Sequence, residues 1–302
     1  MSQYRPRSAI RPQTNSPWDD PLYRSALAKA VLKNYTVPKQ EYRRALAMVE
    51  QQIARTTGDD FDRLYVLVGS LKQQRQWPAS PPVDPIARAQ GRVEDLLKVM
   101  TDPVAPVAVS TNGYLDVGSG DGSITVAIGQ ALGLGPERIV GIDIFPQTTV
   151  TPGMMYLQAR PDGDIPLNSD VIDFTTAFVS LHHVPDANTT IREIRRVSRH
   201  NAIVVIREHN VDSSVDTVAA AFLNLIHAMM MLYGIGEFAL QTEGHSAQKK
   251  EILEYLATIR YRSQAQWDAL FQQAGFDVVN HQTYDPNVSN PQRLYYGVYR
   301  AR

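Results

Sequence analysis

The chain has 302 residues, 43% of them hydrophobic, which is enough for one large domain or for a domain with a helical extension. Its 30 basic and 31 acidic residues leave a net charge of -1, which argues against a dedicated nucleic-acid-binding protein. It contains no cysteine, so disulfides, thiolate metal sites and a cysteine nucleophile are excluded.

The first 80 residues are predicted to form a tail followed by helices. Residues 1–18 are rich in Pro, Arg, Ser, Gln and Asn, which is typical of a flexible tail, and their polar start favours a cytoplasmic location. Over residues 19–80, apolar side chains recur three and four positions apart and predict helices. Residues 1–50 contain nine Lys or Arg against four Asp or Glu, which forms either a solvated face or a platform for RNA.

Prolines between positions 77 and 85 mark a boundary, and strands alternate with helices from residue 86 to residue 302. We therefore expect an α/β fold: a doubly wound, Rossmann-like, mostly parallel sheet that ends in an antiparallel hairpin and carries an N-terminal helical extension. The hairpin is predicted over 276–282 and 294–299. A capping box at Ser263 and Gln266 opens the helix before it, which ends at Gly275.

The most informative motif is a glycine-rich turn after the first predicted strand of this domain, which begins at Tyr114. Its glycines, 118, 120 and 122, are spaced differently from the dinucleotide fingerprint. Asp116, two residues before Gly118, would repel a pyrophosphate at the mouth of the strand, so a cationic cofactor without phosphate fits better. Asp143 ends the second strand, where its carboxylate can accept both hydroxyls of a ribose. The alternative is a plain tight turn.

Residues 110–210, with the motif Leu-Asp-Val-Gly-Ser-Gly-Asp-Gly, resemble the core of a class I S-adenosylmethionine-dependent methyltransferase of the small-domain type. Residues 263–300 resemble its C-terminal end. The resemblance implies S-adenosylmethionine as the cofactor. It also implies an adenine-binding turn in which Asp162 meets the exocyclic amine, with Asp164 in reserve; the alternative is a turn with solvated carboxylates. The expected cofactor contacts are Asp116, Gly118, Ser119, Gly120, Asp143, Ile144, Asp162 and Gly163.

Catalytic candidates follow the fourth and fifth strands. The family often carries a histidine beside the methyl donor, and His183 matches that place. Strand alternation is expected to turn His182 and His183 to opposite sides, so that at most one faces the cofactor. Glu208 and His209 end the fifth strand and could orient or deprotonate a nucleophile. A buried pair of Arg207 with a carboxylate is the structural alternative. No metal site is expected from this spacing.

Residues 213–261 are longer than a simple crossover and are predicted to form a substrate lid. Met230, Tyr233 and His245 are its candidate substrate contacts, although Met and aromatic stripes usually belong to a core. The apolar run from Val218 to Gly236 is expected to be a buried helix, with no membrane association.

The sequence thus predicts an enzyme that transfers a methyl group to a small-molecule acceptor by in-line displacement. The alternatives are an RNA cap methyltransferase that uses the basic N-terminal helices, and a catalytically silent scaffold.

Overall fold

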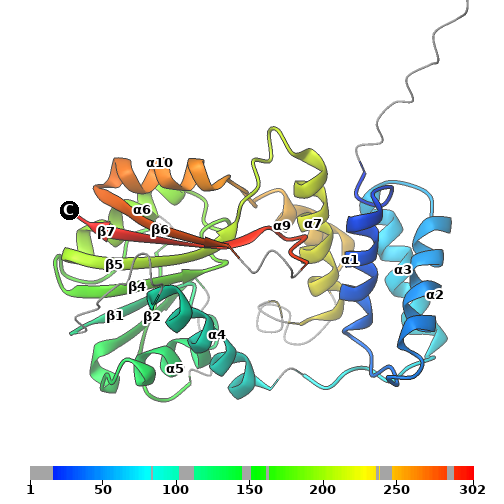
Figure 1. The fold of residues 1–302 in the computed structure, drawn as a ribbon, viewed down its shortest axis with the longest axis horizontal. Helices are drawn as coiled ribbons and strands as arrows, with labels where there is room; N and C mark the ends of the chain where they lie inside the picture. Colours follow the sequence, from blue (N-terminus) through cyan, green and yellow to red (C-terminus); the bar gives the residue numbers. More distant parts are fainter. Residues whose placement is uncertain are drawn as a thin grey trace, which may run out of the picture.

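A computed structural model describes residues 16–82, 84–101, 112–144, 151–160, 163–235, 238, 247–283 and 289–302. Figure 1 shows an α/β domain beside a helical unit. Trp18, predicted to lie in the tail, is instead 1% exposed, and its indole N–H donates to the carbonyl of Asp60 at 3.1 Å. Its large apolar ring belongs to the hydrophobic core of the helices that follow.

The sheet has seven strands in the order β3-β2-β1-β4-β5-β7-β6. The strands up to β5 pair in parallel, while β7 runs antiparallel to both β5 and β6. This arrangement confirms the predicted doubly wound fold and its terminal hairpin. The strand order reverses between β1 and β4, where ligands bind in open α/β sheets. The strands are β1 (Tyr114–Val117), β2 (Ile139–Asp143), β3 (Met155–Gln158), β4 (Ile172–Phe178), β5 (Ser198–His209), β6 (Phe276–Thr283) and β7 (Leu294–Ala301).

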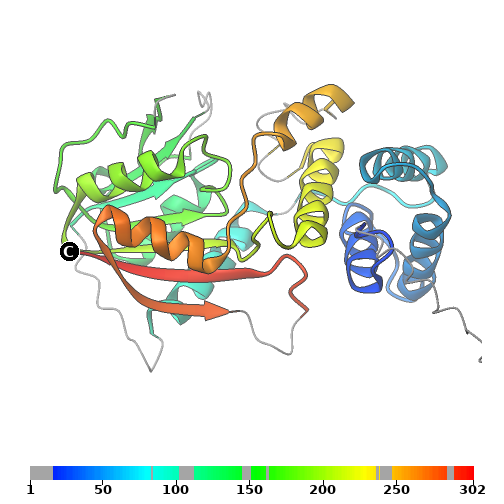
Figure 2. The ribbon, with the colours of Figure 1, turned by 90° about the horizontal axis from the view of Figure 1, so that it is seen from above.

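Two pairs of helices cover the two faces of the sheet (Figures 1 and 2). Helices α4 (Pro85–Met100) and α5 (Ser123–Ala131) share one core with the strands, and a short 3-10 helix, η1 (Pro136–Arg138), precedes β2. Helices α6 (Ala187–Val197) and α10 (Gln264–Ala274) share the other. Helix α10 begins with the predicted capping box and ends at Gly275, whose φ is 99°. Local sequence signals therefore located α10 correctly.

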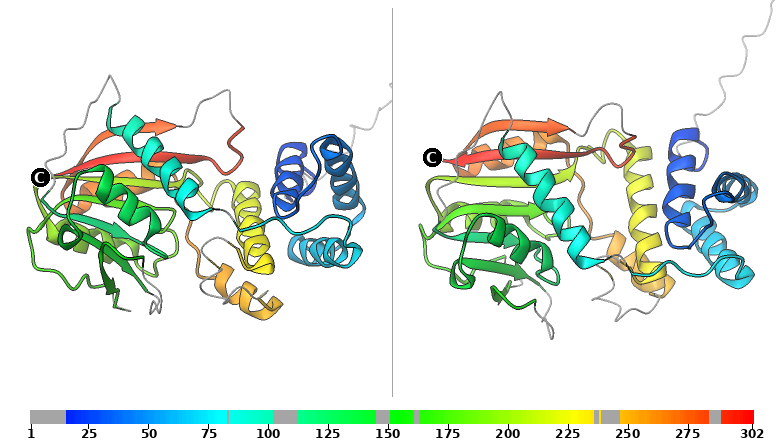
Figure 3. Two further views of the ribbon diagram at one scale, coloured as in Figure 1. Left: turned by 90° about the horizontal axis from the view of Figure 1, so that it is seen from below. Right: turned by 60° about the horizontal axis from the view of Figure 1, so that its bottom comes forward.

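The helical unit combines two segments that are far apart in the sequence (Figure 3). Helices α1 (Pro21–Leu32), α2 (Tyr42–Arg55) and α3 (Asp60–Gln74) share one hydrophobic core with α7 (Thr217–Tyr233) and α9 (Lys249–Leu256). The Tyr35 and Tyr233 hydroxyls lie 3.0 Å apart, and Lys72 donates to the carbonyl of Leu232 at 2.7 Å. The N-terminal helices and the predicted lid therefore form one packed body. None of the described helices is long and apolar enough to cross a membrane.

Candidate functional site

The glycine-rich turn after β1 has a left-handed backbone, with φ of 80° at Gly118 and 54° at Gly120. A Cβ atom at Gly118 would lie 2.3 Å from the Cβ of Ser180, so only glycine allows this approach to the chain after β4. A Cβ at Gly120 would meet no atom within 4 Å. Gly118 therefore permits the packing of the turn, while Gly120 borders open space.

Asp143, at the end of β2, faces the same turn. Its Oδ2 accepts the N–H of Gly120 at 2.9 Å, and its Oδ1 accepts the N–H of Ile144 at 2.7 Å. A carboxylate has about four acceptor positions, so this group can still accept two hydroxyl hydrogens. The Ile144 side chain is 52% exposed and provides an apolar surface beside the carboxylate.

Asp116 lies beneath the turn, whereas the sequence predicted it at the mouth. It is 4% exposed, and its two oxygens accept the hydroxyls of Thr125 and Thr176, each at 2.6 Å. Burial is the largest influence on its pKa and raises it to about 6. Asp116 thus joins β1 to α5 and β4, and it lies below the turn because all four residues of β1 are buried.

Ser119 gives a direct test of whether the turn fits a ligand. Its side chain is 7% exposed, and among the described residues its hydroxyl has no hydrogen-bond partner. Buried polar groups in native proteins are normally paired, so this hydroxyl suits a bound polar group. Together with the open side of Gly120 and the carboxylate of Asp143, it fits a nucleoside cofactor.

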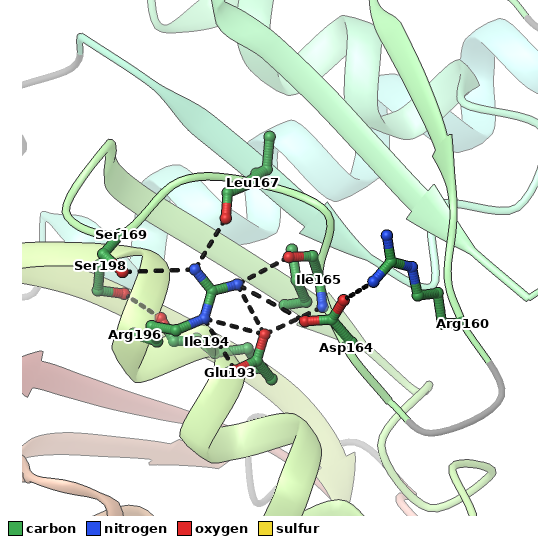
Figure 4. A network of polar contacts seen from close by, with 9 residues as sticks. All are labelled: Arg160, Asp164, Ile165, Leu167, Ser169, Glu193, Ile194, Arg196 and Ser198. Atoms are coloured by element: carbon green, nitrogen blue, oxygen red, sulfur yellow. Dashed lines mark hydrogen bonds and ion pairs between the residues drawn. The ribbon is translucent and has the colours of Figure 1, made fainter.

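The segment after β3 is held in a polar network (Figure 4). Asp162 lies outside the described residues, and Gly163 has a φ of 84°. The Asp164 carboxylate forms ion pairs with Arg160 and Arg196. These pairs argue against its reserve role at the adenine amine.

The centre of this network is Arg196, which donates to the backbone carbonyls of Ile165 and Leu167 at 2.8 Å each. It also bonds to Glu193 at 2.7 Å, and this contact is the main reason why the pKa of Glu193 falls to about 2. The Glu193 carboxylate accepts the N–H of Ile165 at 3.1 Å. The network therefore ties the segment after β3 to helix α6.

The chain after β4 turns sharply at Val179, whose φ is 56°. A positive φ is a genuine outlier for a β-branched residue, and such strain is found at functional sites. Ser180 then donates to the carbonyl of Val117 at 2.7 Å. His182 and His183 follow in this turn with ring centroids 3.9 Å apart, so the predicted strand alternation is wrong. The alternation fails because β4 ends at Phe178.

A histidine cluster, formed by His182, His183, His209 and His227, lies around Glu208. Glu208 is fully buried; its Oε2 lies 2.6 Å from Nδ1 of His182, and its Oε1 accepts the N–H of Leu181 at 2.8 Å. The partner of this buried carboxylate is thus an imidazole from the neighbouring strand end. A carboxylate in this position fixes the orientation and the tautomer of the ring.

His209 differs from the expected proton acceptor. It is 4% exposed, and its Nδ1 lies 2.7 Å from the carbonyl oxygen of Gln292. Burial, followed by the neighbouring His182, lowers its pKa to about 3. A ring with so low a pKa is a weak proton acceptor at pH 7, which argues against its predicted role as a general base.

Three members of the site were missed at the sequence level because they come from the predicted lid. The Tyr255 hydroxyl lies 2.8 Å from Nδ1 of His183, and the Tyr261 hydroxyl lies 3.0 Å from Nδ1 of His227. His227 belongs to α7 and is 4% exposed. A single histidine in an otherwise apolar helix was the available signal.

The predicted substrate contacts are placed elsewhere. Tyr233 bonds to Tyr35, and Met230 packs against the core of the helical unit. These contacts argue against an acceptor pocket formed by the two side chains and favour the structural alternative. His245 lies outside the described residues.

Comparisons with known proteins complete this description. A family model for a methyltransferase domain matches residues 74–281. No curated protein matches the chain significantly. Similar solved structures include a Haloferax volcanii protein described as a methyltransferase, in complex with the Trm112 activator: identity is 15%, coverage is 74% of this chain and 99% of that one, and the TM-score is 0.43.

Two further structures have comparable scores. For a methyltransferase from Thermotoga maritima, identity is 14%, coverage is 70% of this chain and 89% of that one, and the TM-score is 0.39. For the YcgJ protein from Bacillus subtilis, identity is 14%, coverage is 70% and 99%, and the TM-score is 0.44. The family match spans more than half of the sequence and agrees with the sheet order and the glycine-rich turn. The chain therefore belongs to the methyltransferase-domain family and is a class I S-adenosylmethionine-dependent methyltransferase.

Proposed function

We propose that this enzyme methylates a small-molecule nucleophile bound beside the histidine cluster. The observation that carries the proposal is the convergence of the insertion on the carboxyl ends of β4 and β5. Tyr255 and Tyr261 from that insertion bond to His183 and His227, which favours an enclosed acceptor over an open surface. The net charge of -1 agrees with an acceptor that is not a polyanion.

We assign cofactor binding to the turn after β1 and to the end of β2. Asp143 accepts the ribose hydroxyls, Ile144 provides an apolar contact, and Gly120 leaves room for the ligand. Ser119 pairs its buried hydroxyl with a polar group of the cofactor. When bound, S-adenosylmethionine supplies a methyl group on a sulfonium, which is a good leaving group. Catalysis then depends mainly on the alignment that these residues impose.

The histidine cluster orients the acceptor, and His183 takes up its proton. Glu208 fixes the ring of His182, and Tyr255 fixes the ring of His183. His183 is only partly buried, whereas His182 is fully buried, so the cluster meets an acceptor on the His183 side. An acceptor hydroxyl or thiol on that side would transfer its proton to His183 as the methyl group moves.

The acceptor class can be tested with methyl-labelled S-adenosylmethionine. The full chain is incubated with a small-molecule metabolite extract, with capped RNA, and with no acceptor. We expect label in the small-molecule fraction, and we expect Asp143→Ala to lose this activity together with cofactor binding. Label found only in RNA would overturn the proposed acceptor. Cofactor binding without transfer to either acceptor would favour a silent scaffold.

A further inference from the structure

Three histidines from two distant segments meet at one point. His182 and His183 follow β4, and His227 comes from α7, 45 residues after His182. One nitrogen of each ring lies within 4.8 Å of the corresponding nitrogens of the other two. The sequence suggested no metal site, because only the tertiary structure brings His227 to this pair.

The hydrogen bonds of His182 and His227 show which nitrogen of each ring is turned toward the other ring. Nδ1 of His227 lies 2.9 Å from the carbonyl oxygen of Leu223, and a carbonyl can only accept, so this nitrogen is protonated. Nδ1 of His182 faces the Glu208 carboxylate at 2.6 Å, so Nε2 of this ring points away from Glu208. The Nε2 atoms of His182 and His227 face each other at 3.5 Å. Two imidazole nitrogens at this distance can share one proton or bind one metal ion.

Each ring also has an orienting partner of the kind that metal-binding histidines have. Glu208 holds His182 at 2.6 Å, the Tyr255 hydroxyl lies 2.8 Å from Nδ1 of His183, and the Leu223 carbonyl holds His227 at 2.9 Å. Partners of this kind set the tautomer and the direction of the ligating nitrogen. In all three rings these partners contact Nδ1, and Nε2 of His182 and Nε2 of His227 are turned toward each other.

The distances and the charges agree with a tetrahedral ion. With zinc to nitrogen bonds of about 2.0–2.1 Å, two ligands of a tetrahedral site lie about 3.3 Å apart. The 3.5 Å separation of the His182 and His227 nitrogens is close to this value, and small side-chain rotations bring the third nitrogen into range. The carboxylate of Glu208 is fully buried 2.6 Å from Nδ1 of His182, where a divalent cation on that ring would favour its charged form.

We propose that His182, His183 and His227 bind one divalent transition-metal ion of the zinc class and leave a fourth coordination position open. Imidazole ligands suit such ions, and three protein ligands with an open position are typical of catalytic sites. This inference goes beyond the proposed function and does not depend on the identity of the acceptor. An acceptor hydroxyl or thiol at the open position would lose its proton more readily, and with the three rings bound to the ion this proton would pass to water rather than to His183.

Metal binding can be measured without any acceptor. The full chain is stripped with a chelator and titrated with Co²⁺, whose visible absorption reports tetrahedral coordination, and Zn²⁺ is then added as a competitor. We expect saturable binding of about one ion per chain and loss of the absorption with Zn²⁺. His227→Ala should weaken binding more than about 100-fold, and Tyr255→Phe should weaken it about 10- to 100-fold, because it removes only an orienting partner.

The matched control is His200→Ala, since His200 is exposed at the start of β5 and lies outside the cluster. It should bind Co²⁺ like the unmodified chain. Circular dichroism and urea unfolding show whether each variant is folded, and Tyr255→Phe keeps the test decisive if His227→Ala does not fold. The proposal is overturned if the unmodified chain shows no saturable Co²⁺ absorption, or if folded His227→Ala or Tyr255→Phe binds as tightly as His200→Ala.

Discussion

Substituting single glycines by alanine should separate the effect of one methyl group on cofactor affinity from its effect on the free energy of unfolding. Gly120 and Gly133 both have left-handed backbones, with φ of 54° and 74°, and a Cβ on either would meet no atom within 4 Å. Alanine at either position should therefore cost the same strain, about 1–2 kcal/mol of unfolding free energy. Only the Gly120 methyl group would enter the space that we assign to the cofactor.

Alanine at Gly118 should cost more stability than at Gly120 or Gly133, because its Cβ would lie 2.3 Å from the Cβ of Ser180. The same backbone strain plus overpacking of about 1–3 kcal/mol gives a loss of about 2–5 kcal/mol. In urea unfolding, Gly118→Ala should therefore have a clearly lower free energy of unfolding than Gly120→Ala and Gly133→Ala. The last two variants should have equal values.

Calorimetric titration with S-adenosylmethionine then separates the matched pair. We expect Gly120→Ala to bind at least about tenfold more weakly than Gly133→Ala, a difference of about 1.4 kcal/mol. The reasoning is refuted if the two variants are equally stable and bind the cofactor equally well, because the open side of Gly120 would then not be the cofactor site.

Three further predictions concern stability. Burial raises the pKa of Asp116 from 3.8 to about 6. The stability that protonated Asp116 contributes is therefore fully present at low pH and is lost as the pH rises through about 6. Relative to Asp116→Asn, the unmodified chain should lose about 3 kcal/mol between about pH 4 and pH 6 in urea unfolding, and a constant difference would contradict this. Arg196 lowers the pKa of Glu193 to about 2, so the stability lost in Glu193→Gln should be full at neutral pH and vanish as the pH falls toward 2; a pH-independent loss would argue against the network. In a thermodynamic cycle, Tyr35→Phe and Tyr233→Phe should couple by about 0.5–1.5 kcal/mol, and additive effects would show that their 3.0 Å contact contributes nothing.

Local patterns alone predicted the order of the elements. The capping box at Ser263 and Gln266 located the start of α10, and the alternation of strands and helices predicted the doubly wound sheet. The glycine-rich turn and Asp143 predicted the family and its cofactor. Such signals are readable because they depend on the φ angle, the hydrogen-bonding groups or the burial of residues that are near one another in the chain.

The histidine cluster was decided by tertiary structure. Val179 adopts a positive φ that no sequence pattern indicates for a β-branched residue, and the turn that follows brings His182 and His183 to the same side. His227 joins them only because α7 lies next to the turn after β4 at this point, while Tyr233, on the same helix, contacts Tyr35 of the N-terminal helical region. Sequence thus determined the strands, the turn and the cofactor chemistry, which follow from local contacts. The assembly of the cluster follows from packing between segments far apart in the chain, which no local periodicity encodes.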